Sequence, residues 1–151
     1  MKTIILIYLA GQLLRVSAPQ AVTAPDAVGV LAQLYGGQTT FVYAHSYLSG
    51  TLFYDLNEGE TVTAYYSDGS HTDFEVIDIG AYTARSTTIA GGGGDFKLDV
   101  DGQWVKITDV MKMYSAPGGI TFATCYAVDK GLGVVTGRLF VETQPVAEDV
   151  R

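Results

Sequence analysis

Residues 119–125 read Gly-Ile-Thr-Phe-Ala-Thr-Cys, an apolar run that ends at the only cysteine of the 151-residue chain. Its β-branched and aromatic residues, restarted by the turn-forming Pro117-Gly118-Gly119, predict a β-strand. A second strand-like run, Gly137 to Val141, has Arg138 at its beginning. If the two runs are neighbouring antiparallel strands, Cys125 and Arg138 lie at the same end of the sheet.

A cysteine in this position points to nucleophilic chemistry only if a cation or base lies nearby. An unperturbed thiol has a pKa of about 8.5, so only a few per cent is thiolate at neutral pH. An adjacent imidazole or guanidinium favours the reactive thiolate. His45 ends the strand-like stretch Thr39-Thr40-Phe41-Val42-Tyr43-Ala44-His45. Three residues suited to acyl transfer therefore stand at the ends of predicted strands.

These three segments resemble the signature segments of sortases, the cysteine transpeptidases that join proteins to bacterial surfaces. Residues 121–125, Thr-Phe-Ala-Thr-Cys, resemble the sortase sequence Thr-Leu-x-Thr-Cys. Residues 39–46 resemble the sortase strand that runs into Gly-His-Ser or Gly-His-Arg, with Ala44 in place of the glycine. Arg138 leads its strand as the sortase arginine leads the final strand. The resemblance covers roughly residues 38 to 143.

The resemblance implies a fold and an activity. The fold would be all-β and mainly antiparallel, a closed sortase-like barrel of about eight strands with one or two short helices. The length suits one catalytic domain spanning residues 1–151. Cys125 would attack a peptide carbonyl, His45 would protonate the departing amine, and Arg138 would stabilise the oxyanion or hold the substrate backbone.

The family also implies substrates and a location. The carbonyl would belong to the threonine of a C-terminal sorting signal of the Leu-Pro-x-Thr-Gly type. An amine from a cell-wall peptide or a protein would resolve the acyl-enzyme, or water would do so if no amine arrives. The implied location is the extracellular face of the membrane or the secreted space. The chain shows no run of ~20 apolar residues for a transmembrane anchor.

Candidate substrate-binding residues come from two segments. In the family the connection before the cysteine strand helps to line the groove, which here means residues 104–117 with Met111, Met113 and Tyr114. Soft apolar side chains suit a leucine pocket, although ordinary packing onto the barrel explains them equally well. Thr124 either orients the strand end or contacts substrate.

Charge and composition exclude several classes of partner. Nine basic and sixteen acidic residues give a net charge of -7, which disfavours nucleic acid as a partner. A single cysteine forms no internal disulfide, and with only two histidines a zinc site is disfavoured. The acidic residues near the predicted groove do not have EF-hand spacing, so no metal and no cofactor is expected. These residues are Asp95, Asp99, Asp101 and Asp109.

Residues 1–37 carry two further expectations. Residues 1–18 read either as the first strands or as a signal-like segment, with Lys2 before an apolar run and Val16-Ser17-Ala18 as a cleavage-like site. Apolar residues at helical spacing in residues 27–35, after Pro25 and before Gly36-Gly37, predict a short helix.

After residue 37 the chain predicts successive antiparallel strands. Helical turns are expected around residues 52–56 and 108–114, and residues 90–94, Ala-Gly-Gly-Gly-Gly, are expected to form a mobile loop. The expected strands are Gln38–Ala44, Thr61–Tyr66, Asp73–Thr83, Phe96–Val100, Gln103–Ile107, Ile120–Cys125 and Gly137–Val141.

A non-catalytic interpretation stays open. Free cysteine is commonly a small buried residue, so the chain could be a small β-barrel that binds a ligand or a protein, with Cys125 as a structural residue. The oligomeric state, the class of sortase and the sorting motif do not follow from the sequence.

Overall fold

The computed structural model describes residues 2–18, 29–85, 97–125, 128–129, 134–135 and 137–146. The expected glycine loop at residues 90–94 lies outside the described residues, as do Pro25 and Asp95.

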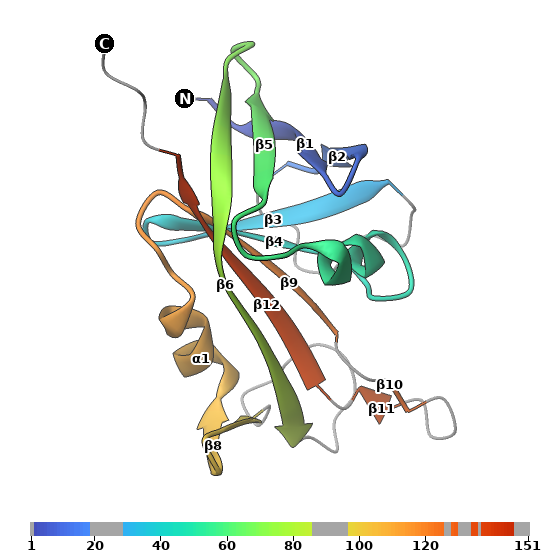
Figure 1. The fold of residues 1–151 in the computed structure, drawn as a ribbon, viewed down its shortest axis with the longest axis vertical. Helices are drawn as coiled ribbons and strands as arrows, with labels where there is room; N and C mark the ends of the chain where they lie inside the picture. Colours follow the sequence, from blue (N-terminus) through green and yellow to red (C-terminus); the bar gives the residue numbers. More distant parts are fainter. Residues whose placement is uncertain are drawn as a thin grey trace.

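Eight strands form a closed barrel (Figure 1). Their order around the barrel is β12-β9-β4-β3-β2-β1-β5-β6, and β6 pairs with β12 to close it. The pairs are antiparallel except β2–β3 and β4–β9, which are parallel. The prediction of a closed, mainly antiparallel barrel of about eight strands is therefore confirmed. The strands are β1 (Ile4–Leu9), β2 (Gln12–Val16), β3 (Val30–Gly36), β4 (Thr39–Tyr43), β5 (Thr61–Tyr66), β6 (His71–Arg85), β9 (Ile120–Cys125) and β12 (Gly137–Pro145).

The remaining elements connect or extend the strands of this barrel. The 3₁₀ helix η1 (Ser49–Asp55) and the helix α1 (Ile107–Met113) are the two short helical segments, close to the predicted helical turns. Strands β7 (Lys97–Val100) and β8 (Gln103–Lys106) continue the sheet from the far end of β6. The hairpin of β10 (Val128–Asp129) and β11 (Val134–Val135) stands between β9 and β12 in the chain (Figure 1).

The helix predicted for residues 27–35 is wrong. Residues 30–36 form β3, which lies between β2 and β4 in the barrel. Leu31, Ala32 and Gln33 are all fully buried, so both faces of the strand are covered and the alternation that identifies a half-exposed strand is missing. The buried amide of Gln33 donates from Nε2 to the carbonyl oxygens of Ile4 and Ser17, and each N···O distance is 2.8 Å.

The first residues of the described chain form strands. β1 and β2 make an antiparallel hairpin whose turn residues, Ala10 and Gly11, have φ of 46° and 78°. Such left-handed backbone suits glycine and closes a two-residue hairpin. β1 also pairs with β5, so this hairpin supplies two of the eight barrel strands.

Two apolar clusters stabilise the molecule. The larger fills the barrel, with fully buried Ile7, Val62 and Phe122 among its members. The smaller joins α1 to the outer face of β12 through Val110, Tyr114 and Phe140. Leu139 and Val141 belong to the barrel cluster, so β12 alternates between the two.

A buried carboxyl fixes the connection between α1 and β9. Glu142 on β12 is 9% exposed, and its Oε2 accepts a hydrogen bond from the backbone N–H of Ala116 over 3.2 Å. The hydroxyl of Thr39 donates to the carbonyl oxygen of Ala116 over 2.9 Å. Burial raises the pKa of Glu142 above its ordinary value, and the nearby charge of Asp78 raises it further.

Replacing Phe122 with alanine tests the barrel core. Phe122→Ala is expected to lower the free energy of unfolding by about 3–5 kcal/mol, because the ring is fully buried and its loss leaves a cavity. Leu13→Ala, on a side chain that is 56% exposed, should change stability by less than about 0.5 kcal/mol. Urea denaturation measures both, and equal losses would contradict the assigned core.

Glu142→Gln tests the buried carboxyl. Since the folded pKa is raised, the stabilising protonated form is fully present below the ordinary pKa of a glutamate and is lost as the pH rises through the raised value. Glu142→Gln should therefore gain stability relative to wild type between pH 4 and pH 8, as measured by urea denaturation. Glu75→Gln, on an exposed residue, is the control. A pH-independent difference for Glu142→Gln would contradict the assignment.

Candidate active site

The sheet register places Cys125 and Arg138 on adjacent strands and His45 two residues beyond the end of the next strand, β4. β9 pairs antiparallel with β12, and Cys125 stands directly opposite Arg138. β4 pairs parallel with β9, and the last pair is Tyr43 with Ala123. His45 and Cys125 each follow that pair by two residues. Because neighbouring strands are about 4.8 Å apart, His45, Cys125 and Arg138 belong to one end of the sheet.

A side-chain hydrogen bond extends this register beyond the last ladder pair. The buried hydroxyl of Thr124 donates to the carbonyl oxygen of Ala44 over 2.7 Å. Ala44 is itself buried in the barrel cluster. The bond therefore joins the residue before His45 to the residue before Cys125. This contact agrees with the first of the two roles considered for Thr124, orientation of the strand end.

His45 begins a tight turn into η1. Its carbonyl oxygen accepts hydrogen bonds from the backbone N–H groups of Leu48 and Gly50, and each N···O distance is 3.0 Å. Its imidazole stacks on the ring of Tyr47, with ring centroids 4.9 Å apart and an angle of 18° between the planes. Tyr47 and Gly50 are site residues that the sequence did not reveal, because no motif marks them. The only local signal is an aromatic residue shortly after the histidine.

Arg138 is partly exposed at the start of β12. By the alternation of the strand it shares a face with Phe140, which packs under α1. A guanidinium stays charged at all relevant pH values and offers several donors in a fixed fork. For Cys125 the structure describes the backbone, and the side chain lies outside the description.

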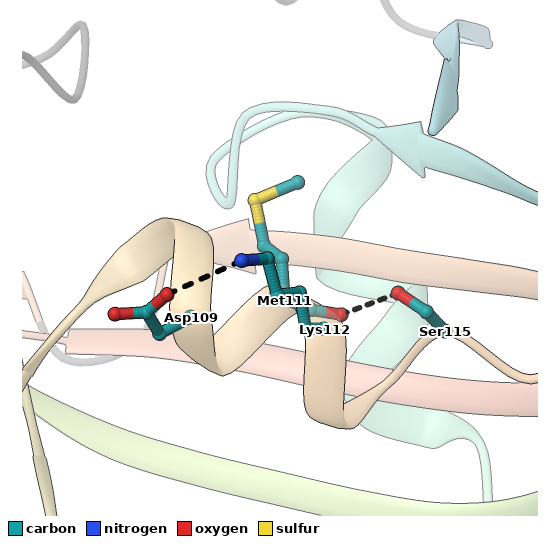
Figure 2. A network of polar contacts seen from close by, with 4 residues as sticks. All are labelled: Asp109, Met111, Lys112 and Ser115. Atoms are coloured by element: carbon teal, nitrogen blue, oxygen red, sulfur yellow. Dashed lines mark hydrogen bonds and ion pairs between the residues drawn. The ribbon is translucent and has the colours of Figure 1, made fainter. Parts of the chain in front are cut away.

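The three candidate groove residues of the α1 segment differ in exposure. Met113 is 54% exposed, whereas Met111 is partly buried against the smaller cluster. Figure 2 shows Ser115 reaching back to the carbonyl oxygen of Met111, a hydrogen bond of 2.7 Å that ends α1. It also shows the ammonium of Lys112 and Asp109, which are 3.6 Å apart. The helix α1 is thus ended by the Ser115 hydrogen bond, and the thioether of Met113 is exposed at its last residue.

Tyr114 lies deeper than a groove residue. Its side chain is 3% exposed, and its ring stacks on Phe140 with centroids 5.2 Å apart. Its phenol is hydrogen bonded to that of Tyr82, and its carbonyl oxygen accepts from the hydroxyl of Thr121. Burial is the main cause that raises the pKa of Tyr114, and the hydrogen bond with Tyr82 is the second cause, so the phenol stays neutral. These contacts favour a packing role.

In the described ranges, neither a metal-ligand cluster nor the cavity near Thr40 and Ile120 lies at the strand ends that carry His45 and Cys125. Within the described ranges, no three His, Cys, Asp or Glu side chains gather as metal ligands would. A cavity of about 310 Å³ lies at the opposite end of β4 and β9, where Thr40, Ile120, Lys2 and Tyr66 contribute to its lining. The candidate active site is therefore the shared end of β4, β9 and β12, away from this cavity.

Comparison with solved structures identifies the architecture. Sortase C from Clostridium perfringens has a TM-score of 0.57 at 15% identity, over 95% of this chain and 69% of that one. Sortase C-1 from Actinomyces oris has a TM-score of 0.57 at 18% identity, over 95% of this chain and 73% of that one. The chain has the sortase fold.

Sortase A from Corynebacterium diphtheriae shares this fold with a TM-score of 0.60 at 17% identity, over 99% of the present chain. The chain spans 63% of the length of that sortase. Neither a protein-family model nor a curated protein matches the sequence. The sortase likeness is thus one of backbone architecture.

None of the helices in the described ranges has the length and apolar character needed to cross a membrane.

Thr124→Val tests the hydrogen bond that extends the register. The substitution keeps the shape but leaves the buried carbonyl oxygen of Ala44 without this donor, so the free energy of unfolding should fall by about 1–3 kcal/mol. Thr63→Val is the matched control, because the hydroxyl of Thr63 bonds to Asp73 at the exposed surface. Its effect should stay within about 0.5 kcal/mol. Equal stability of Thr124→Val and wild type would contradict the role.

Proposed function

We propose that this chain is a sortase-like cysteine transpeptidase that acts as a single catalytic domain. The observation that carries the proposal is the register across β4, β9 and β12. Cys125 is paired with Arg138, and His45 and Cys125 each lie two residues beyond the last pair of β4 with β9, Tyr43 with Ala123. The sortase fold supports it as well, because the backbone likeness extends over 95–99% of the chain.

Each residue has a role that its chemistry suits. The thiolate of Cys125 attacks the peptide carbonyl, and the guanidinium of Arg138 stabilises the oxyanion or binds the substrate backbone. The imidazolium of His45 gives its proton to the departing amine as the C–N bond breaks, which leaves a thioester on Cys125. An incoming amine then attacks the thioester and returns a proton to His45. The acyl group forms a new amide bond with this amine, and Cys125 leaves as the thiolate.

The proposed substrate is a protein with a C-terminal sorting signal of the Leu-Pro-x-Thr-Gly type. The proposed acceptor is an amine of a cell-wall peptide or of another protein, and the reaction would take place on the extracellular face of the membrane or in the secreted space. Thr124 would hold the strand end. Met111 and the exposed Met113 are the side chains of the α1 segment that suit an apolar residue of the signal. Tyr114 would support them from below.

The second candidate function is a binding module with the same barrel and no catalysis. The observation that favours it is the packing of Tyr114, because a buried phenol in place of an open groove residue suits a protein that needs only a stable barrel. The two functions differ in the reactivity of the thiol.

Thiol reactivity and peptide cleavage test the proposal together. Cys125 is the only cysteine, so a methanethiosulfonate reagent adds at most once per chain and mass spectrometry reports that residue alone. Streptococcus agalactiae sortase C1, which shares the fold, has been solved as a complex with MTSET. The native chain should be modified and should cleave peptides from a sorting-signal library, with amide formation when an amine is added. An inert native thiol would favour the binding module.

Substitutions assign the roles. Cys125→Ala should abolish cleavage. His45→Ala should lower kcat by about 10²–10⁴-fold, and Arg138→Ala by about 10²–10³-fold. The chain offers matched controls in its other histidine, His71, and in Arg15 on β2. His71→Ala and Arg15→Ala should keep the wild-type kcat, and a loss in these controls equal to that in the site variants would contradict the assignment.

A further inference from the structure

The ladder between β4 and β9 ends before His45. Its last pair is Tyr43 with Ala123. Beyond it, the backbone of His45 is held by the turn into η1, through the N–H groups of Leu48 and Gly50 on its carbonyl oxygen. The direction of the imidazole therefore depends on how closely η1 approaches the strand ends.

Gly50 lies very close to the strand ends. A Cβ placed on Gly50 would lie 2.3 Å from the Oγ1 of Thr124, 2.6 Å from the carbonyl oxygen of His45 and 2.7 Å from that of Ala44. Side-chain carbon atoms do not approach oxygen this closely, so the site has no room for any side chain. Gly50 is buried, and its N–H donates to the carbonyl oxygen of His45 at a distance of 3.0 Å.

The crowding atoms have little freedom to move. Two of the three are backbone carbonyl oxygens, and the third, the hydroxyl of Thr124, is held by its hydrogen bond to Ala44. The neighbouring Ser49 is fixed from its other side, because its hydroxyl accepts from the backbone N–H of Gly29 over 2.8 Å. A methyl group on residue 50 would therefore displace the start of η1 or the backbone of His45.

We propose that Gly50 is a positioning residue for His45. Its missing side chain lets η1 pack against the ends of β4 and β9, and this contact sets the His45 backbone in register with Cys125. The effect of Gly50 on turnover rests on the proposed function, whereas its effect on the placement of His45 does not.

Gly119 supplies a matched control. A Cβ on Gly119 would lie 2.2 Å from the carbonyl oxygen of Thr143, so Gly119→Ala creates a comparable clash. It does so at the opposite end of β9, immediately before Ile120. Gly50→Ala and Gly119→Ala are thus both expected to destabilise the fold, and only the first lies beside His45. Thermal denaturation sets a temperature at which both variants are folded.

Imidazole NMR spectra of the full chain test the placement directly. The chain has two histidines, so ¹H–¹³C spectra show two imidazole signals, assigned with His71→Gln. Gly50→Ala should shift the His45 signals and leave those of His71 on β6 unchanged, and Gly119→Ala should shift neither. Unchanged His45 signals in folded Gly50→Ala, or equal shifts in both variants, would overturn the proposal.

Kinetics separate this proposal from the proposed function. Gly50→Ala should lower kcat for peptide cleavage at least ~10-fold with little change in KM and an altered pH profile, since it displaces a proton-transfer group and no substrate contact. Gly119→Ala should retain the wild-type kcat. If wild type cleaves no peptide while Gly50→Ala still shifts the His45 signals, the proposed function fails and the positioning role stands. If wild type cleaves and Gly50→Ala matches it in kcat and pH profile, the positioning role fails alone.

Discussion

The parallel pairing of β4 with β9 is the contact on which the rest of the structure depends. If β4 and β9 were antiparallel, the C-terminal end of β4, next to His45, and the C-terminal end of β9, at Cys125, would lie at opposite ends of the sheet. The parallel pair brings the ends of β4 and β9 together, and the antiparallel partner β12 then begins where β9 ends. A slip of one residue would turn every side chain of the strand to the other face.

The ladder alone does not carry this alignment as far as His45. The hydroxyl of Thr124 continues it by one residue through the carbonyl oxygen of Ala44, and Gly50 continues it further by closing the turn onto His45. Ala44 fits here because its methyl group is buried in the barrel, where a small side chain is accommodated. The end of the sheet is therefore held by groups whose function is geometric, beside residues whose function would be chemical.

The sequence predicted the strands that alternate or that lie between clear turns. β5 and β9 match their expected bounds at both ends, and β4 and β12 begin within one residue of theirs. β3 could not be read in this way, because Leu31, Ala32 and Gln33 are all buried and a short apolar run has no decisive period. Its strand conformation depends on ladders with β2 and β4, and those are contacts that local sequence does not encode.

The candidate site divides along the same line. By itself, the sequence determined which residue types are present and that His45, Cys125 and Arg138 each stand at the end of a strand-like run, because side-chain chemistry and local periodicity are local properties. Only the tertiary structure decided that those ends meet, that Tyr114 is buried, and that Gly50 has no room for a side chain. These are distances between segments far apart in the chain, and they are set by barrel closure and close packing.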